Sequence, residues 1–86
     1  MLILWDEPKH QVNLAKHHLD FAELDANFFL HAVVVPARVG RFQAIGRFNG
    51  ALIAVIFSRL GSEALSVISM RSAGVRERRL FDEHQT

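Results

Sequence analysis

The sequence predicts an α+β domain: helices packed on a small antiparallel sheet, with elements in the order β-α-α-β-β-β-β-α. Three observations predict it. Asn49-Gly50 separates two runs of β-branched and apolar residues, which is the strongest short-range signal of a β-hairpin. Apolar residues recur at helical spacing from residue 8 to residue 19. The 86 residues leave room for one hydrophobic core, so we expect a single domain over residues 1–86.

The N-terminal segment predicts a strand followed by a helix. Residues 2–5 (LILW) are a short apolar run typical of a strand. Asp6 stands where a helix N-cap residue is expected, and Pro8 suits the first helical turn, where its missing N–H is not needed. The helix is predicted from Glu7 to about His18. Its apolar face would comprise Pro8, Val12, Ala15 and Leu19, and its polar face Lys9, Asn13, Lys16 and His17.

A second helix is predicted from Phe21 to about Phe29. Asp20, followed three residues later by Glu23, forms an aspartate version of the capping box that begins many helices. Residues 32–35 (AVVV) then predict a strand that stops at Pro36, because proline cannot donate to a strand ladder.

The rest of the chain predicts a meander and a final helix. Residues 41–48 and 51–58 flank the hairpin turn, and a turn near Gly61 leads to a strand at 64–71. Consecutive strands joined by short turns predict antiparallel neighbours. Ser72 is placed to cap a last helix from about Ala73 to Glu83.

Composition restricts the class of protein. Hydrophobic residues make up 50% of the chain and charged residues 22%, which is typical of a folded domain. The absence of cysteine excludes disulfides and thiolate–metal sites. The longest apolar run, 51–57, is far shorter than the roughly 20 residues of a membrane helix. Residues 1–9 lack the features of a secretory signal. We therefore expect a soluble cytoplasmic protein without a membrane segment.

Charge is distributed unevenly along the chain. Residues 1–30 carry two lysines against five acidic residues, whereas residues 38–79 carry eight arginines against two glutamates. Arginine offers a planar fork that matches phosphate, whereas lysine is the commoner solubilising cation. The asymmetry favours a polyanionic partner such as RNA.

Strand alternation predicts where the arginines point. Arg41, Gln43 and Arg47 would share one side of their strand with Ile45. Ser69 and Arg71 would share a side with Leu65 and Val67. A sheet face that is apolar at one end and arginine-lined at the other would form the floor of a cleft, with Arg76 and Glu77 of the last helix overhanging it. The alternative, weighed equally, is the hydrated face of a one-sided sheet.

The motifs exclude several chemistries. The five histidines have no metal-ligand spacing, and the chain has no glycine-rich phosphate loop, Gly-x-Ser-x-Gly motif or paired carboxylates. His17 beside Lys16 is a candidate general acid or base, although a surface histidine is more often structurally neutral. RNA cleavage by its own 2′-hydroxyl remains compatible, because it requires proton transfer and cations around the phosphate but no cofactor or metal.

Three segments resemble the BrnT family, the toxins of type II toxin–antitoxin systems. The first is WDEPKHQVNLAKHHLDF (5–21), with its Trp-Asp pair, Pro-Lys, Asn-x-x-Lys-His and hydrophobic-x-Phe. The second is GRFQAIGRFNGALIAVIF (40–57), which matches the family's hairpin. The third is SVISMRSAGVRERR (66–79), with a Ser-x-Arg…Arg-Glu-Arg ending. The resemblance extends from Trp5 to about Phe81.

The resemblance implies a RelE-like fold, a bacterial cytosolic setting and RNA cleavage that stops translation. It also implies neutralisation by a BrnA-type antitoxin that binds operator DNA. The catalytic positions carried over are Lys16, His17, Arg47, Arg71 and Glu77. The RNA-binding positions expected are Arg41, Ser69, Arg76 and Arg78. No cofactor or metal is expected.

The chain also departs from the family pattern at three positions. His18 stands where the family often has glycine, and Ser72 and Val75 stand where basic residues are common.

The alternative function is a non-catalytic interaction module, a degenerate toxin that binds an antitoxin or RNA. Direct DNA binding is a weaker alternative, because neither early helix is basic enough to be a recognition helix. Phe29 and Phe81 could belong to the core, to a partner interface or to self-association when the antitoxin is absent.

Overall fold

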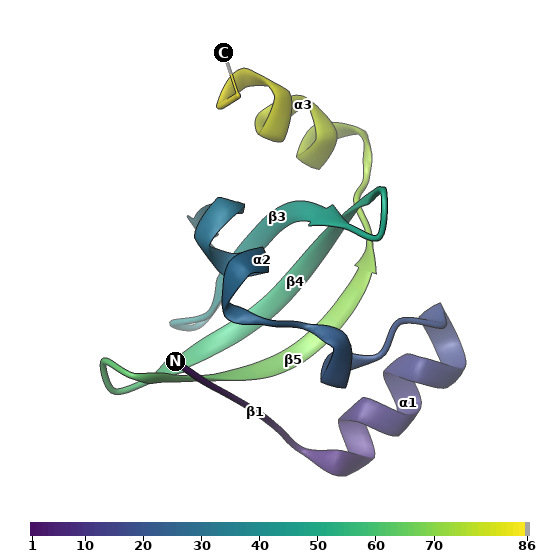
Figure 1. Ribbon diagram of the computed structural model, residues 1–86, viewed down its shortest axis with the longest axis vertical. Helices are drawn as coiled ribbons and strands as arrows, with labels where there is room; N and C mark the ends of the chain where they lie inside the picture. The colour runs from purple at the N-terminus through teal and green to yellow at the C-terminus, as the bar shows by residue number, and fades with distance from the viewer. Residues whose placement is uncertain (86) are drawn as a thin grey trace.

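The computed structural model describes residues 1–85, and Thr86, the last residue of the predicted domain, lies outside them. Five strands form one sheet in the order β1-β5-β4-β3-β2, with three α-helices and one 3-10 turn around it in the described chain (Figure 1). The elements are β1 (Leu2–Trp5), α1 (Glu7–His17), η1 (Phe21–Glu23), α2 (Ala26–His31), β2 (Val33–Pro36), β3 (Phe42–Phe48), β4 (Ala51–Leu60), β5 (Ala64–Ser72) and α3 (Val75–Glu83).

The sheet is mixed, so the prediction of a purely antiparallel sheet was wrong. Strands β2 to β5 form the expected antiparallel meander, but β1 joins the outer edge of β5 in parallel, pairing Leu2 with Ala64 and Trp5 with Val67. The direction of β1 depends on its pairing with β5, about 60 residues later in the chain. A local sequence pattern does not encode such a pairing.

The predicted hairpin turn is confirmed. Asn49 and Gly50 both have positive φ angles, 49° and 81°, and connect the paired residues Phe48 and Ala51. Positive φ at both turn residues matches the right-handed twist of the flanking strands, and asparagine and glycine tolerate it best.

The second predicted helix is divided in two. Asp20 caps only the 3-10 turn η1, where its carboxylate accepts a hydrogen bond from the Ala22 N–H at 2.9 Å. Leu24 is extended, and Asp25 begins α2 by accepting from the Phe28 N–H at 3.0 Å. A single helix over residues 21–29 does not form, because Asp25 caps a new helix start inside the predicted span.

The last helix begins later than predicted. Ser72 ends β5, and Gly74 is the N-cap of α3. The Glu77 carboxylate reaches back to accept from the Gly74 N–H at 2.7 Å, which satisfies one of the donors that a helix start leaves unpaired. This contact also fixes Glu77 at the junction of β5 and α3.

Helix α1 packs on a different face from the one that the sequence predicted. Its buried residues are His10 and Asn13, whereas Val12 is 66% exposed. The His10 ring nitrogens hydrogen-bond Glu7 at 3.1 Å and Asp20 at 2.5 Å. These contacts, Asp20 first, raise the pKa of His10. The prediction from spacing was wrong because polar partners compensate the buried polar groups.

The core lies on both sides of the sheet. We call the side that carries Ala44, Val55 and Met70 the core face, and the side that carries Gln43, Ile56 and Ser69 the open face. Helix α2 and η1 cover the core face, which includes the buried residues Phe21, Phe28, Phe57, Val67 and Met70. Phe28 is therefore part of the core. Phe29 is half-buried, and its ring packs edge-on against Phe28 and Phe57.

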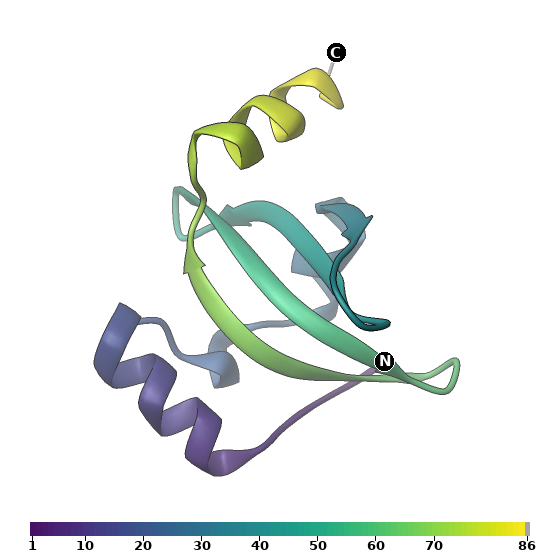
Figure 2. The same cartoon turned by 180° about the vertical axis from the view of Figure 1, so that it is seen from behind.

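A smaller cluster closes one end of the open face under α3. It joins Ile45, Leu52, Ala73 and Phe81, and Phe81 is only 3% exposed, so this ring belongs to the core. Figure 2 views the open face, where β4 and β5 lie in front, α1 flanks β5 and α3 follows at its end. The rest of the open face carries the candidate site.

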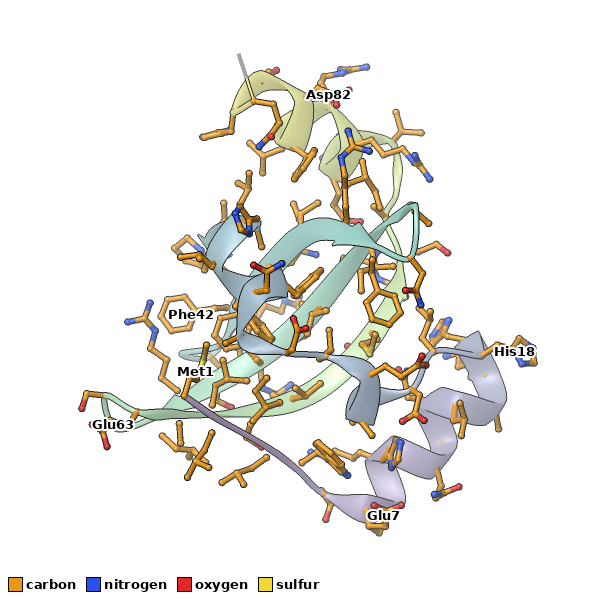
Figure 3. All side chains as sticks on the ribbon, viewed as in Figure 1. Met1, Glu7, His18, Phe42, Glu63 and Asp82 are labelled. Atoms are coloured by element: carbon orange, nitrogen blue, oxygen red, sulfur yellow. The ribbon has the colours of Figure 1, made fainter. Side chains whose placement is uncertain are left out.

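His18 terminates α1 in the left-handed conformation, with φ 58° and ψ 29°, and it points outward from the helix end (Figure 3). A side chain costs about 1–2 kcal/mol in this region. We predict that His18→Gly raises the free energy of unfolding by about 0.5–1 kcal/mol, measured by urea denaturation. His18→Ala retains the Cβ atom and is the control. Equal stabilities of the two variants would contradict the prediction.

Candidate functional site

Arg71 and Glu77 form the most tightly connected polar cluster on the open face. Two guanidinium nitrogens of Arg71 donate to the two carboxylate oxygens of Glu77 at 2.7 and 2.6 Å. Gln43 donates to the same carboxylate at 2.6 Å, from two strands away. A two-pronged arginine–carboxylate pair fixes orientation as well as distance. We call Arg71, Glu77 and Gln43 the Arg71 cluster.

The hydrogen bonds of the cluster keep the Glu77 carboxylate negatively charged. The hydrogen bonds from Arg71, followed by those from the Gly74 N–H and Gln43, lower the pKa of Glu77 from 4.5 to about 2, although burial opposes the shift. The side chain is only 16% exposed. A carboxylate that accepts four hydrogen bonds and has so low a pKa is a poor proton acceptor at neutral pH. It orients Arg71 instead.

Arg71 itself retains capacity for a ligand. Its guanidinium has five N–H groups and makes three hydrogen bonds, two to Glu77 and one to the Ser72 carbonyl, which leaves two N–H groups without a partner in the described residues. The side chain is 40% exposed. It can therefore bind an anion from solvent without releasing Glu77.

A β-bulge places Arg71 on this face. Ile56 pairs with Ser69 and Phe57 with Val67, so Ile68 is an extra residue in β5. Val67 and Met70 are both in the core-face cluster, and Ser69 and Arg71 lie on the open face. The prediction that Ser69 and Arg71 share a side with Leu65 and Val67 was therefore wrong, because the extra residue reverses the alternation.

A groove between α1 and β5 adjoins the Arg71 cluster. It has a volume of about 390 Å³ and is lined by Pro8, Lys9, Val12, Asn13, Lys16, His17, Ile68 and Ser69. Ser69 and Arg71 are alternate residues on one face, which places them about 7 Å apart along the strand. The structure thus brings Lys16, His17 and Ser69 together, with Arg71 at the next position along β5.

Asn13 holds the two walls of the groove together. Its side-chain oxygen accepts from the Met70 N–H at 3.0 Å, and its side-chain nitrogen donates to the Leu19 carbonyl at 3.2 Å. The first bond satisfies an edge position of β5 beyond the end of β1. The position of Lys16 and His17, one turn further along α1, therefore depends on Asn13.

Arg47 lies outside this arrangement. It is exposed on β3, and its guanidinium carbon lies 5.5 Å from the centre of the Phe81 ring. It lines a separate hollow with Asn27, His31 and other residues between α2 and α3. Phe81 is one helical turn beyond Glu77, so Arg47 and Arg71 contact successive turns of α3. The two arginines share a face of the sheet, but they do not converge on one pocket.

The remaining predicted positions are peripheral. Arg41 is exposed just before β3, and Arg76 and Arg78 are exposed on α3. None of the three lines the groove, and Arg78 lines a separate hollow along α3. Within residues 1–85 no group of three or more histidine, aspartate or glutamate residues could hold a metal ion. No helix in the same residues is long and apolar enough to span a bilayer.

Sequence reasoning missed the supporting residues of the site. Strand alternation predicts the correct side for Gln43 but no role for it, and its bond to Glu77 spans 34 positions. Helical spacing predicts only a polar face for Asn13. The signal that could have found it is the Asn-x-x-Lys-His motif, because an asparagine one turn before two candidate site residues suggests a positioning role.

Comparisons with known proteins agree with the sequence resemblance. The family model for the ribonuclease toxin BrnT of type II toxin–antitoxin systems matches residues 5–77. A crystal structure of the Brucella abortus ribonuclease toxin BrnT is similar to this chain with a TM-score of 0.81 and 64% sequence identity. The similarity covers 86% of this chain and 97% of that chain. No curated protein matches this chain.

The lowered pKa of Glu77 predicts a pH-dependent stability. Because the folded pKa of about 2 lies below the ordinary 4.5, the ionised carboxylate stabilises the fold above pH 4.5, and this contribution is lost as the pH falls towards 2. We predict that Glu77→Gln lowers the unfolding free energy by about 1–3 kcal/mol at pH 6. The difference from the parent protein should shrink at pH 3, as measured by urea denaturation.

The control for this prediction is Glu23→Gln. Glu23 is exposed, and its side chain makes no hydrogen bond within the described residues. It should change stability by less than about 0.5 kcal/mol. An effect of Glu77→Gln that is the same at pH 6 and pH 3 would contradict the assigned charge.

Proposed function

This chain belongs to the BrnT family of ribonuclease toxins of type II toxin–antitoxin systems, and we propose that it cleaves RNA at the groove between α1 and β5. The observation that carries the proposal is the Arg71 cluster beside that groove. It presents an oriented guanidinium, while Lys16 and His17 place an ammonium group and an imidazole on the groove.

The proposed reaction uses the substrate's own 2′-hydroxyl. That oxygen forms a bond to the adjacent phosphorus, the bond from phosphorus to the 5′-oxygen breaks, and a 2′,3′-cyclic phosphate and a 5′-hydroxyl result. Negative charge increases on the phosphate oxygens in the transition state. The two unpaired N–H groups of Arg71 would bind those oxygens, and preorganised donors of this kind stabilise such charge strongly.

His17 and Lys16 would handle the protons. His17 is the last residue of α1 and is half-buried in the groove wall, so its imidazole can accept the proton of the 2′-hydroxyl. The ammonium of Lys16, also on the groove, would supply a proton to the departing 5′-oxygen or compensate its charge. Glu77 remains ionised throughout and orients Arg71. Arg47 is assigned to RNA binding rather than to the reacting phosphate, because it lines a different hollow.

We further propose the wider biology that the family resemblance implies. The chain would stop translation by cleaving RNA in the bacterial cytoplasm, and its fold would be RelE-like. A BrnA-type antitoxin that binds DNA would neutralise it. Exposed apolar residues support a protein partner, since Leu2 is 63% exposed, Leu4 44% and Leu60 48%. In the absence of the antitoxin the same residues would favour self-association.

A non-catalytic interaction module is the second candidate. The observation that favours it is the separation of Arg47 from Arg71, which leaves a single oriented guanidinium at the groove. Binding RNA without producing cleavage products between pH 5 and 9 would favour this module over the ribonuclease.

Arg71→Ala tests the ribonuclease directly. We expect cleavage of a labelled RNA to fall by roughly 10²–10³-fold in single-turnover assays, because the charge on the phosphate loses its donors. Growth arrest on expression should be lost. Arg38→Ala, in the exposed loop before β3, removes the same charge and should leave cleavage within about threefold. EDTA should leave the parent protein's rate unchanged.

The result of this experiment is interpretable only for folded protein. Circular dichroism and thermal denaturation should show that Arg71→Ala keeps its secondary structure. A folded Arg71→Ala variant that cleaves RNA and arrests growth like the parent protein would remove Arg71 from the site.

His17→Ala tests the proton-transfer role. General acid–base groups contribute about 10²–10⁴-fold, so the single-turnover rate should fall by that factor at neutral pH while RNA binding changes little. His31→Ala, at the end of α2, is the matched control and should keep the parent rate. If weaker RNA binding accounts for all of the loss in His17→Ala, the histidine is a binding residue and the proposed role is wrong.

A further inference from the structure

The floor of the groove between α1 and β5 is apolar, and no step of the proposed reaction uses it. Val12 of α1 and Ile68 of β5 face this groove, with Pro8 at the start of the helix. Val12 is 66% exposed, although apolar residues at helical spacing normally pack against the sheet. Two structural features create this floor.

The first is the orientation of α1. Because His10 and Asn13 make the contacts that hold the helix to η1 and β5, the face that carries Val12 is turned to the groove. The second is the bulge in β5. Ile68, the extra residue, lines the groove together with Ser69, its neighbour in the chain. A regular strand would point one of these two residues away.

The rim of the groove is cationic. Lys9, Lys16 and His17 line it, and Arg71 lies at the next open-face position along β5. Among the described residues no acidic side chain lines the groove, and Glu77, the carboxylate of the Arg71 cluster, is already paired with Arg71. An apolar floor with this rim is complementary to a nucleotide, whose base is flat and largely apolar on its faces and whose phosphates are anionic. The positive charge of the rim therefore favours an anionic ligand such as RNA over a peptide that has few acidic residues.

The polar groups left in the groove suit the backbone of RNA rather than its base edges. Both polar atoms of the Asn13 side chain are engaged, one by Met70 and one by Leu19. Besides the charged side chains, Ser69 contributes a hydroxyl. Base identity is read by paired donors and acceptors on the base edge, and the floor formed by Val12 and Ile68 offers none.

We propose that the groove is a nucleotide-binding subsite in which Val12, Ile68 and Pro8 contact the face of a base next to the cleaved bond, while Lys9 and Lys16 bind its phosphates. The proposal rests on the proposed ribonuclease function and adds a substrate class to it. The enzyme takes single-stranded RNA, because a paired base could not lay its face on the floor, and it tolerates any base at this position.

Val12→Ser tests the subsite. Val12 is exposed, and valine and serine have similar helix propensities, so the fold should be unaffected. The probe is a short 2′-O-methyl oligoribonucleotide, which cannot be cleaved, and its binding is measured by fluorescence anisotropy. We expect the Kd to rise roughly three- to tenfold for Val12→Ser, whereas Val12→Ile should bind like the parent protein. In cleavage assays Val12→Ser should raise KM and leave kcat unchanged.

Leu30→Ser is the matched control, since Leu30 is an exposed aliphatic residue of α2 outside the groove. It should bind the probe like the parent protein. Probes of uniform U, C, A or G should differ in Kd by less than about tenfold. A preference of about a hundredfold for one base would overturn the predicted tolerance.

Other outcomes separate this inference from the function on which it rests. If the parent protein binds and cleaves RNA and Val12→Ser does so equally well, the subsite is wrong and the ribonuclease stands. If Val12→Ser binds RNA normally but loses affinity for the purified antitoxin, the groove is a protein-docking surface and the inference fails. If the parent protein neither binds the probe nor cleaves RNA, the proposed function itself fails.

Discussion

The single extra residue in β5 determines the chemistry of the open face. Because Ile68 has no partner on β4, Met70 returns to the core while Ser69 and Arg71 turn to the other side of the sheet. There Arg71 hydrogen-bonds the carboxylate of Glu77 in the first turn of α3, and Ser69 lines the groove together with residues of α1. Without the bulge, Arg71 would point towards the phenylalanine cluster, where an unpaired charge would cost several kcal/mol.

The site is supported by buried and part-buried polar contacts on two sides. Glu77 holds Arg71 and the start of α3 at once, so one carboxylate joins strand β5, helix α3 and, through Gln43, strand β3. On the other side Asn13 joins α1 to the edge of β5, and His10 joins it to Asp20. In a domain of this size such contacts are a large fraction of net stability. They also keep the two walls of the groove at a fixed separation.

These arrangements leave apolar surface exposed where a simpler helix packing would have buried it. Val12 in the groove and Leu2, Leu4 and Leu60 around β1 are all more than two-fifths exposed. We propose that the first contacts substrate and the others a protein partner. The groove has a cationic rim, whereas the hollow beside Met1 carries both a cation, Arg59, and an anion, Glu63.

Local chemistry determined much of this protein from the sequence by itself. The Asn49-Gly50 turn, the order of the elements, the cap at Asp6 and the excess of arginine in the second half depend on short-range rules or simple counting. The family resemblance predicts Lys16, His17, Arg71 and Glu77 as site residues. In the structure Lys16 and His17 line the groove, and Arg71, paired with Glu77, lies at the next open-face position of β5 after Ser69. The tertiary structure decided the parallel pairing of β1, the face that α1 buries, the bulge at Ile68 and the separation of Arg47 from Arg71. Each of these depends on contacts between segments distant in the chain, such as Asn13 with Met70 and Gln43 with Glu77, and their free energies have no counterpart in a local pattern.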